Sequence, residues 1–265
     1  MRRFLMAFLV TGAVVAPSAG LVFADSLPPL EDSPVTLNPS AEISVQTAIG
    51  SLIDDLDGNT VKNVQLDQVE QDLVFSCPVG TCPGKIIIEQ AGFHADNVMG
   101  IYDLSDVGTD PDRVVLFVGG NVAGDAASFS FDGDGSVIVN GVDTNTFFDS
   151  GESFGVYIQS PSGIFFQEDD RNPSDRRHVV IFHAESAGVS SNGVSTLDHS
   201  FFFAFEDLPQ GAPRADFDYN DFIYNFQIQT ETPPPPVIPE PGTMLLFGLG
   251  GLGAAISRRR KSTTA

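Results

Sequence analysis

Short apolar runs separated by turn residues dominate the chain between residues 41 and 230. The runs are rich in Val, Ile and Phe, and each is bounded by Gly, Asp, Asn or Pro, which is the pattern of β-strands joined by turns. No sustained helical periodicity accompanies them. The pattern predicts strands at Lys85–Gln90, Val98–Asp103, Arg113–Val118, Ala127–Phe131, Ser136–Asn140, Ser153–Gln159, His178–Ala184, Ser200–Glu206 and Phe222–Gln229.

The spacing of these runs predicts an all-β fold, an antiparallel β-sandwich of jelly-roll-like type. Asn140-Gly141 and Asp132–Gly135 are expected to be hairpin or loop turns. The run Phe201–Phe205 is apolar on both faces, so we expect it in a central strand covered on two sides. Residues 41–72 are ambiguous between a strand and a short helix.

The N-terminal end reads as a targeting segment. It has Arg2 and Arg3, an apolar stretch from Phe4 to Ala16, and the small-residue site Val22-Phe23-Ala24, which together are typical of a secretory signal peptide. A retained membrane anchor is the alternative. The expected divisions of the chain are a signal peptide at 1–24, a linker at 25–40, a β-sandwich domain at 41–230, a Pro-rich linker at 231–238 and a sorting tail at 239–265.

The tail combines Pro239-Glu240-Pro241, an apolar run from Met244 to Ile256 and the basic cluster Arg258–Lys261. As a short hydrophobic helix, the run would be about 20 Å long, less than the ~30 Å hydrocarbon core of a bilayer. These features in this order resemble a PEP-CTERM sorting signal. The resemblance implies export, a transient inner-membrane tether with the Arg cluster in the cytoplasm, processing by an exosortase, and a final place at the cell surface or in the extracellular matrix. An ordinary C-terminal anchor is the alternative.

Charge narrows the choice of partners. The chain has 13 Lys and Arg against 35 Asp and Glu, a formal net charge of −22. Without the two targeting ends, seven basic and 34 acidic residues leave a net charge of −27. This charge excludes nucleic acid as a partner, because phosphate binding depends on Lys and Arg. Cations are the expected counterpart.

The two cysteines, Cys77 and Cys82, enclose Pro78–Thr81 and precede Pro83-Gly84, which is turn chemistry. In an oxidising compartment this spacing predicts a small disulfide loop that pins a turn. A zinc site would need two more ligands, and the histidines show no compact ligand spacing.

Acidic side chains concentrate between Glu206 and Asp221. Asp216, Asp218 and Asn220 have the same parity as the apolar positions of the following strand, so extended geometry would lean their oxygens toward the rim of the core. Like charges about 4 Å apart repel by about 4 kcal/mol at an effective dielectric near 20, so such a cluster takes up protons or binds a cation. Oxygen ligands outside the cytoplasm favour calcium. The expected Ca²⁺ ligands are Glu206, Asp207, Asp216, Asp218, Asn220 and Asp221.

Alternatives stay open for these acidic groups. The carboxylates can instead cap loop amides and pair with Arg214. Asp55–Asn59 and Asp132–Gly135 fit either further calcium loops or solvated turns. An EF-hand is excluded, because its sixth position requires Gly and this segment has Asp221 there.

The pair Phe205–Leu208 and Asp216–Asp221 is the specific part of a second resemblance, to a domain of unknown function common in PEP-CTERM and other exported bacterial proteins. The resemblance covers about residues 85–230. It implies a β-rich exported domain with a calcium site and no established activity, and it places a small acidic loop at Gln167–Asp170 that could add a ligand. The other marks of the resemblance are Ala91-Gly92-Phe93, Gly100–Tyr102, Phe154–Tyr157, Asn172-Pro173 and His178–Val180.

Together these features favour an exported, non-catalytic surface or matrix protein with a calcium-stabilised β domain. A calcium-dependent polysaccharide-binding module or adhesin is the first alternative, because this sorting class is associated with exopolysaccharide producers. The lack of Trp weighs against it, since Trp and Tyr usually supply the stacking platform. A secreted hydrolase is the second alternative. Glu206 and Asp218 offer an acid/base pair, but no His-Glu-x-x-His motif occurs.

Overall fold

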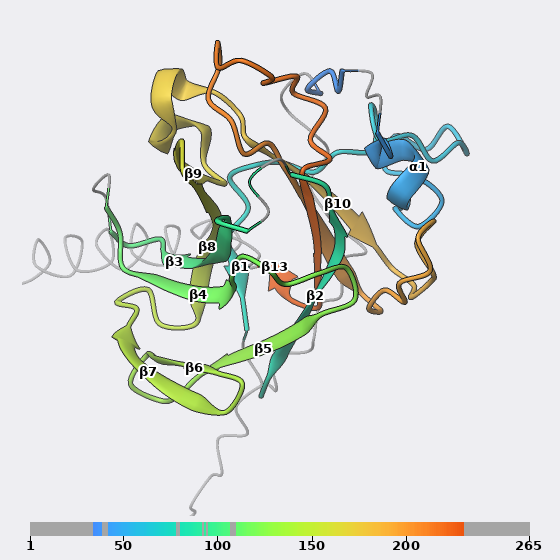
Figure 1. The fold of residues 1–265 in the computed structure, drawn as a ribbon. Helices are drawn as coiled ribbons and strands as arrows, with labels where there is room; N and C mark the ends of the chain where they lie inside the picture. Colours follow the sequence, from blue (N-terminus) through green and yellow to red (C-terminus); the bar gives the residue numbers. More distant parts are fainter. Residues whose placement is uncertain are drawn as a thin grey trace, which may run out of the picture. The chain divides into compact units, whose positions relative to one another are not determined.

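The computed structural model describes residues 34–38, 42–77, 80–91, 93, 95–106 and 110–230 (Figure 1). The expected signal peptide, Pro-rich linker and sorting tail lie outside these residues. The chain divides into two compact units, residues 1–230 and 231–265, and every described residue belongs to the first. Among the described residues, no helix is both long and apolar enough to cross a membrane.

The described part of the chain is built almost entirely from β-strands. Every strand pairing in it is antiparallel. Each of the nine predicted runs overlaps a strand. The elements are α1 (Val45–Ile49), β1 (Phe75–Ser76), β2 (Cys82–Glu89), β3 (Val98–Asp103), β4 (Arg113–Phe117), β5 (Ala126–Phe131), β6 (Ser136–Val139), β7 (Val142–Phe147), β8 (Ser153–Ser160), β9 (Gly163–Phe166), η1 (Asp169–Arg171), η2 (Pro173–Asp175), β10 (Val179–Ala184), β11 (Ser200–Phe205), β12 (Phe222–Phe226) and β13 (Gln229–Thr230).

The strands form two sheets that pack as a sandwich, as the spacing predicts (Figure 1). The seven-stranded sheet has the order β10-β11-β12-β2-β5-β6-β7. The six-stranded sheet has the order β13-β1-β8-β3-β4, and β9 also pairs with β8. The strands on either side of β2 and β8 come from distant parts of the sequence, so the sandwich closes only when most of the chain is in place.

Phenylalanine rings fill the space between the sheets. Phe75 meets Phe201 and Phe203 edge to face, with ring centroids 5.1 Å apart in both pairs. Such edge-to-face pairs add about 0.5–1.5 kcal/mol to the burial of the rings. The alternate residues Phe222, Tyr224, Phe226 and Ile228 lie in this core, which confirms the predicted period of two.

A second group of apolar side chains, the outer cluster, covers the other face of β10, β11 and β12. It includes Val45 and Ile49 of α1, with Phe202, Phe182 and Ile223 of the sheet. The whole run Ser200–Phe205 is therefore buried on both faces, as predicted. The ambiguity of residues 41–72 resolves into one short helix followed by irregular chain.

Three strands, β1, β7 and β9, were not predicted, and the predicted run Phe222–Gln229 joined β12 to the first residue of β13. β7 lies at one edge of its sheet, and its exposed residues include Val142 and Phe147. Because neither face of β7 is buried, its sequence lacks the alternation of apolar and polar residues that marks a strand. The turn before it was predicted correctly. Asn140 and Gly141 have φ of 51° and 79°, which suits the primed turns of two-residue hairpins.

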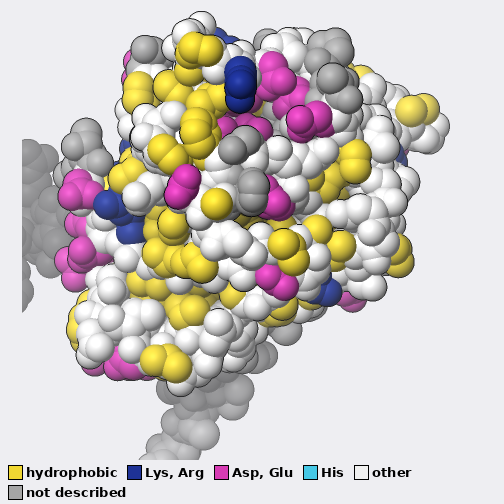
Figure 2. Space-filling view, viewed as in Figure 1, with side chains coloured by type: hydrophobic (Ala, Val, Ile, Leu, Met, Phe, Trp, Pro, Cys, Tyr) yellow, Lys and Arg dark blue, Asp and Glu magenta, His cyan; other side chains and the backbone are white. Residues whose placement is uncertain are grey.

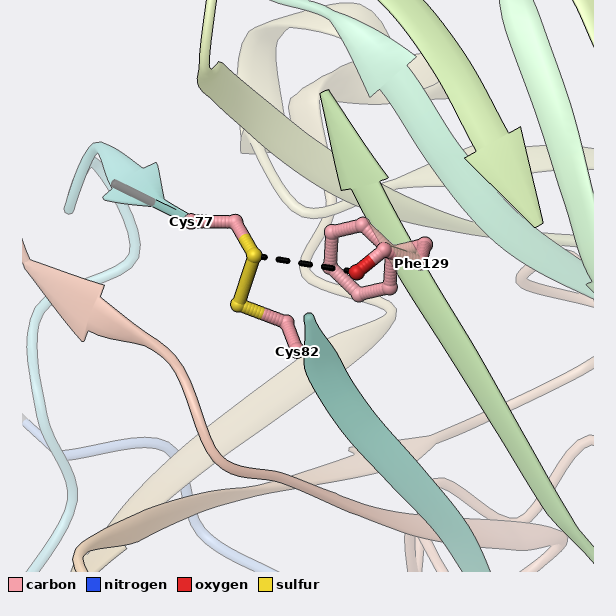
Figure 3. Close-up of a disulfide and its surroundings, with 3 residues drawn as sticks. All are labelled: Cys77, Cys82 and Phe129. Atoms are coloured by element: carbon pink, nitrogen blue, oxygen red, sulfur yellow. Dashed lines mark hydrogen bonds between the residues drawn. A yellow bond between two sulfur atoms is a disulfide. The ribbon is translucent and has the colours of Figure 1, made fainter. Parts of the chain in front are cut away.

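A disulfide joins Cys77, which follows β1, to Cys82, the first residue of β2 (Figure 3). The Cys77 sulfur lies 3.7 Å from the carbonyl oxygen of Phe129, on the neighbouring strand β5. A disulfide sulfur has no proton to donate, so this is a packing contact. The bond anchors the short strand β1 to the start of β2.

We expect the double change Cys77→Ser, Cys82→Ser to lower the free energy of unfolding by about 2 kcal/mol, because the closed ring contains only about six residues. Urea denaturation of the variant and of the oxidised wild type measures the difference. A loss above about 4 kcal/mol would contradict a role confined to pinning the turn.

Candidate metal centre

The register of β11 and β12 brings two carboxylates together. Phe205 pairs with Phe222, so Glu206 and Asp221 follow as the next opposed positions at the end of the same ladder. Backbone bonds to neighbouring strands hold both residues in place, from Glu206 N–H to the His178 carbonyl at 2.9 Å and from Gln90 N–H to the Asp221 carbonyl at 2.8 Å. Like charges at opposed positions are destabilising unless something offsets them.

The loop that leads from β11 to β12 is not extended at residues 217 and 219. The predicted parity of Asp216, Asp218 and Asn220 with the residues of β12 is therefore wrong. Phe217 and Tyr219 have φ of 55° and 59°, in the left-handed region. The burial of both rings in the outer cluster accounts for this geometry.

The bend wraps the loop around Glu206. The Phe217 N–H donates to Glu206 Oε2 at 2.9 Å. The Arg176 guanidinium lies over the Phe217 ring, 3.8 Å from its centroid. Asn38 also holds the loop, because its N–H donates to the Phe217 carbonyl at 3.2 Å and its side-chain amide donates to the Asp216 carbonyl.

Five carboxylates gather here in two groups that share Glu206. One group is Glu206, Asp216 and Asp218, and the other is Glu206, Asp207 and Asp221. Within each group, one oxygen from every residue lies within 4.8 Å of the others. We call these five residues the acidic centre. The structure thus brings together all the carboxylates that the sequence selected.

The sixth selected residue, Asn220, is buried beside the acidic centre. Its side-chain amide donates to the Ile43 carbonyl at 3.1 Å, and its N–H donates to Asp218 Oδ1 at 3.2 Å. These bonds orient the Asn220 amide and hold Asp218 at the same time.

Glu206 is the most demanding member of the acidic centre. Its side chain belongs to a residue only 1 % exposed, and Oε1 has no hydrogen-bond partner. Burial, and then the charges of Asp221 and Asp216, raise its pKa to about 9. Burial and the charge of Asp207 raise the pKa of Asp221 to about 8. At neutral pH and without a cation, both carboxyls therefore keep their protons.

The pKa values of Asp207 and Asp216 are shifted in the same direction as those of Glu206 and Asp221. Burial raises the pKa of Asp207 despite the hydrogen bond from Asn97, and burial with the Asp218 charge raises the pKa of Asp216. No ion pair from a basic side chain to the five carboxylates is found among the described residues. The alternative pairing with Arg214 is thus not formed there.

Sequence reasoning missed Asn97. Its side-chain amide donates to Asp207 Oδ2 at 2.6 Å, and its Oδ1 is buried without a hydrogen-bond partner. Ser160 Oγ donates to the Asp207 carbonyl at 2.7 Å. Asn97 immediately precedes β3 and Ser160 ends β8, both strands of the six-stranded sheet, so the acidic centre lies at the rim of the sandwich. Asn97 is 110 residues from Asp207 and carries no local signal.

The acidic loop at Gln167–Asp170 is engaged elsewhere. The Gln167 amide donates to the backbone of Gln71 and Leu73, each at 2.8 Å. Glu168 pairs with Arg171, and Asp169 pairs with Arg177 at 3.0 Å. These contacts are structural and join the loop to its own surroundings.

Two further acidic loops lie outside the acidic centre. Asp132 and Asp134 form an exposed turn in which Asp132 Oδ1 accepts the Ser136 N–H at 2.9 Å. Asp55 and Asp57 form a third carboxylate group with Asp67, which the sequence reasoning missed. Asp67 is fully buried, and its two oxygens accept backbone N–H groups of residues 56, 57 and 63.

The donor set of the acidic centre suits a hard divalent cation. Calcium takes six to eight oxygens and tolerates irregular geometry, so mixed carboxylate and amide oxygens at a loop fit it. A cation would ionise Glu206 and Asp221 and supply a partner for Glu206 Oε1. The five carboxylates and the orphaned amide oxygen of Asn97 are the groups available to hold it.

Comparison with known families identifies two parts of the chain. Residues 237–261 match the PEP-CTERM protein-sorting motif, and residues 136–229 match a domain of unknown function, DUF4114. The chain carries a PEP-CTERM sorting motif and a DUF4114 domain. The motif implies an exported protein that an exosortase sorts. No curated protein and no solved structure matches the chain.

The DUF4114 match begins at Ser136 and includes the whole acidic segment 206–221. It leaves out β2, which lies between β12 and β5, and β3, which pairs with β8. It also leaves out Asn97. The sandwich that carries the DUF4114 region is therefore larger than the matched residues.

Proposed function

We propose that the chain is a non-catalytic cell-surface or extracellular-matrix protein whose β domain is stabilised by calcium at the acidic centre. The observation that carries this proposal is Glu206 Oε1, a buried carboxylate oxygen without a hydrogen-bond partner, on the residue that both carboxylate groups share. An unpaired buried charge is costly, whereas a bound cation turns the same group into a ligand.

The arrangement supports ion binding better than hydrolysis. Glu206 and Asp218, which the sequence offers as an acid/base pair, lie in one group around a common point together with Asp216. Glycosidases instead place their two carboxyls on opposite sides of a scissile bond. His178, another candidate base, stacks on Phe165 with centroids 3.9 Å apart, and burial lowers its pKa to about 4.

The proposed location follows from the sorting motif. We propose that the apolar tail tethers the exported chain to the inner membrane until the exosortase acts near Pro239-Glu240-Pro241. The β domain then reaches the cell surface or matrix, where calcium is abundant and calcium bound at the acidic centre stabilises the fold.

Thermal unfolding of the full chain tests the calcium site. We expect about 1 mM calcium to raise the Tm over that in chelator, since at 100 times Kd a ligand of the folded state adds about 2.7 kcal/mol, or roughly 5–10 °C for a domain of this size. The double change Asp218→Asn, Asp221→Asn should abolish the increase.

The matched control is Asp132→Asn, Asp134→Asn, which removes two carboxylates from an exposed turn outside the acidic centre and should keep the full increase. A wild-type Tm that is equal in calcium and chelator would reject the site. An undiminished increase in the Asp218, Asp221 variant would move the ion to another group, with Asp55, Asp57 and Asp67 the first to test.

A further inference from the structure

A cavity of about 640 Å³ opens beside the acidic centre. Asp207, Asp216 and Asp221 line it, so a cation held by the group of Glu206, Asp207 and Asp221 would border the cavity. Figure 2 shows Asp and Glu side chains gathered near the top of the view, where Figure 1 places the orange segment between β11 and β12. The volume falls within the range of sites that hold small-molecule ligands.

The other walls differ in chemistry. Gln90, Asn220 and Ser162 contribute amide and hydroxyl groups, and Phe93 and Pro213 contribute apolar surface. Phe93 is 36 % exposed, which is unusual in a chain whose other described rings mostly fill the core. The cavity therefore combines carboxylates next to the proposed cation, a few uncharged polar groups and an exposed aromatic ring.

We propose that this cavity binds a neutral saccharide through two adjacent hydroxyls that coordinate the calcium ion. The inference rests on the proposed calcium site and gives the class of ligand that binds on the side of the ion facing the cavity. Calcium has room for six to eight oxygens, so hydroxyls of a ligand can complete a coordination shell that protein carboxylates begin. The ring of Phe93 offers a flat face against which the apolar face of a sugar packs.

Charge selects a neutral sugar over an acidic one. The body of the chain has a net charge of −27, and its carboxylates form the wall of the cavity itself. Arg214 is the one basic side chain in the described lining. A uronate would therefore bring a negative charge close to several carboxylates, and repulsion between like charges opposes its binding.

The Phe93 platform also explains how a chain without Trp can hold a sugar. The sequence places its tyrosines in the folded interior, where Tyr102, Tyr157, Tyr219 and Tyr224 are all at most 2 % exposed. Phe93 is a large aromatic side chain that stays accessible and lines this cavity.

A glycan array probed with the full chain tests the inference. The slide carries neutral oligosaccharides of glucose, galactose, mannose and fucose, with uronate oligosaccharides beside them. We expect retention on neutral spots in about 1 mM calcium and at least a tenfold loss in chelator. Phe93→Ala should lower retention about tenfold while keeping the calcium-dependent rise in Tm. Phe147→Ala removes another exposed ring, on β7 away from this cavity, and should bind like the wild type.

The outcomes separate the two proposals. A rise in Tm with calcium but no retained glycan would overturn the saccharide site and leave the calcium site standing. Retention confined to uronate spots would overturn the neutral class, and retention unchanged in chelator would overturn coordination through calcium. No rise in Tm together with no retention would overturn both proposals.

Discussion

Glu206→Gln is expected to abolish the response to calcium while leaving the calcium-free domain at least as stable as the wild type. The reason is the protonation state of Glu206. Its pKa is raised to about 9, so at pH 7.5 the calcium-free protein buries a neutral carboxyl there. Gln has nearly the same shape and is neutral at every pH. The substitution therefore removes a ligand of calcium without removing a charge from the calcium-free state.

The order of stability of the variant and the wild type should differ between chelator and calcium. In chelator, the variant should unfold at the wild-type Tm or above it. In calcium at about 100 times Kd, the wild type should gain about 2.7 kcal/mol and the variant none of it. Thermal unfolding in both conditions measures the four values. Glu185→Gln is the matched control, because Glu185 is exposed and lies just beyond the far end of β10.

Two results would count against this account. A variant that is destabilised by several kcal/mol in chelator would mean that Glu206 acts as a structural hydrogen-bond acceptor for the Phe217 N–H rather than as an ion ligand. A variant with the full calcium response would mean that Glu206 contributes no ligand oxygen.

The parts of this structure that the sequence predicts are those set by buried periodic patterns. The runs with a buried face, such as Phe222–Ile228 and Phe201–Phe205, were placed correctly, because burial of one face fixes the register of a strand. β7 escaped because it is an exposed edge strand and burial imposes no pattern on it.

The sequence likewise predicts the positions of some residues of the acidic centre and not of others. Glu206 and Asp221 flank two adjacent antiparallel strands, so their meeting follows from the strand register. The positions of Asp216 and Asp218 depend on the left-handed conformations of Phe217 and Tyr219, which no local propensity favours for aromatic residues. Asn97 arrives through the packing of one sheet on the other, which sequence spacing does not report.

In the absence of calcium, the free energy of unfolding is expected to fall as the pH rises from 7 to 9. Glu206 and Asp221 have pKa values near 9 and 8 in the folded chain, far above an ordinary carboxyl. In this range the folded chain still binds protons that the unfolded chain has released, so stability decreases with pH. Each pKa unit corresponds to about 1.4 kcal/mol, and the two groups together give a loss of about 3–4 kcal/mol over this range.

Between pH 7 and 9, the buried imidazole of His178 does not contribute to the change in the free energy of unfolding. Burial lowers the pKa of His178 to about 4, so this group changes stability only below an unfolded-state pKa near 6.5. Urea denaturation at pH 7, 8 and 9 in chelator measures the loss, and Glu206→Gln should make it smaller.

Calcium should remove this pH dependence, because the ion holds Glu206 and Asp221 in their charged form at every pH in the window. Binding at pH 7 must then release protons, and calorimetric titration in two buffers of different ionisation enthalpy counts them. The affinity for calcium should accordingly rise with pH. A calcium-free stability that stays constant or increases from pH 7 to 9 would show that the carboxyls are already ionised, and the buried charge of Glu206 would then need a partner other than a metal ion.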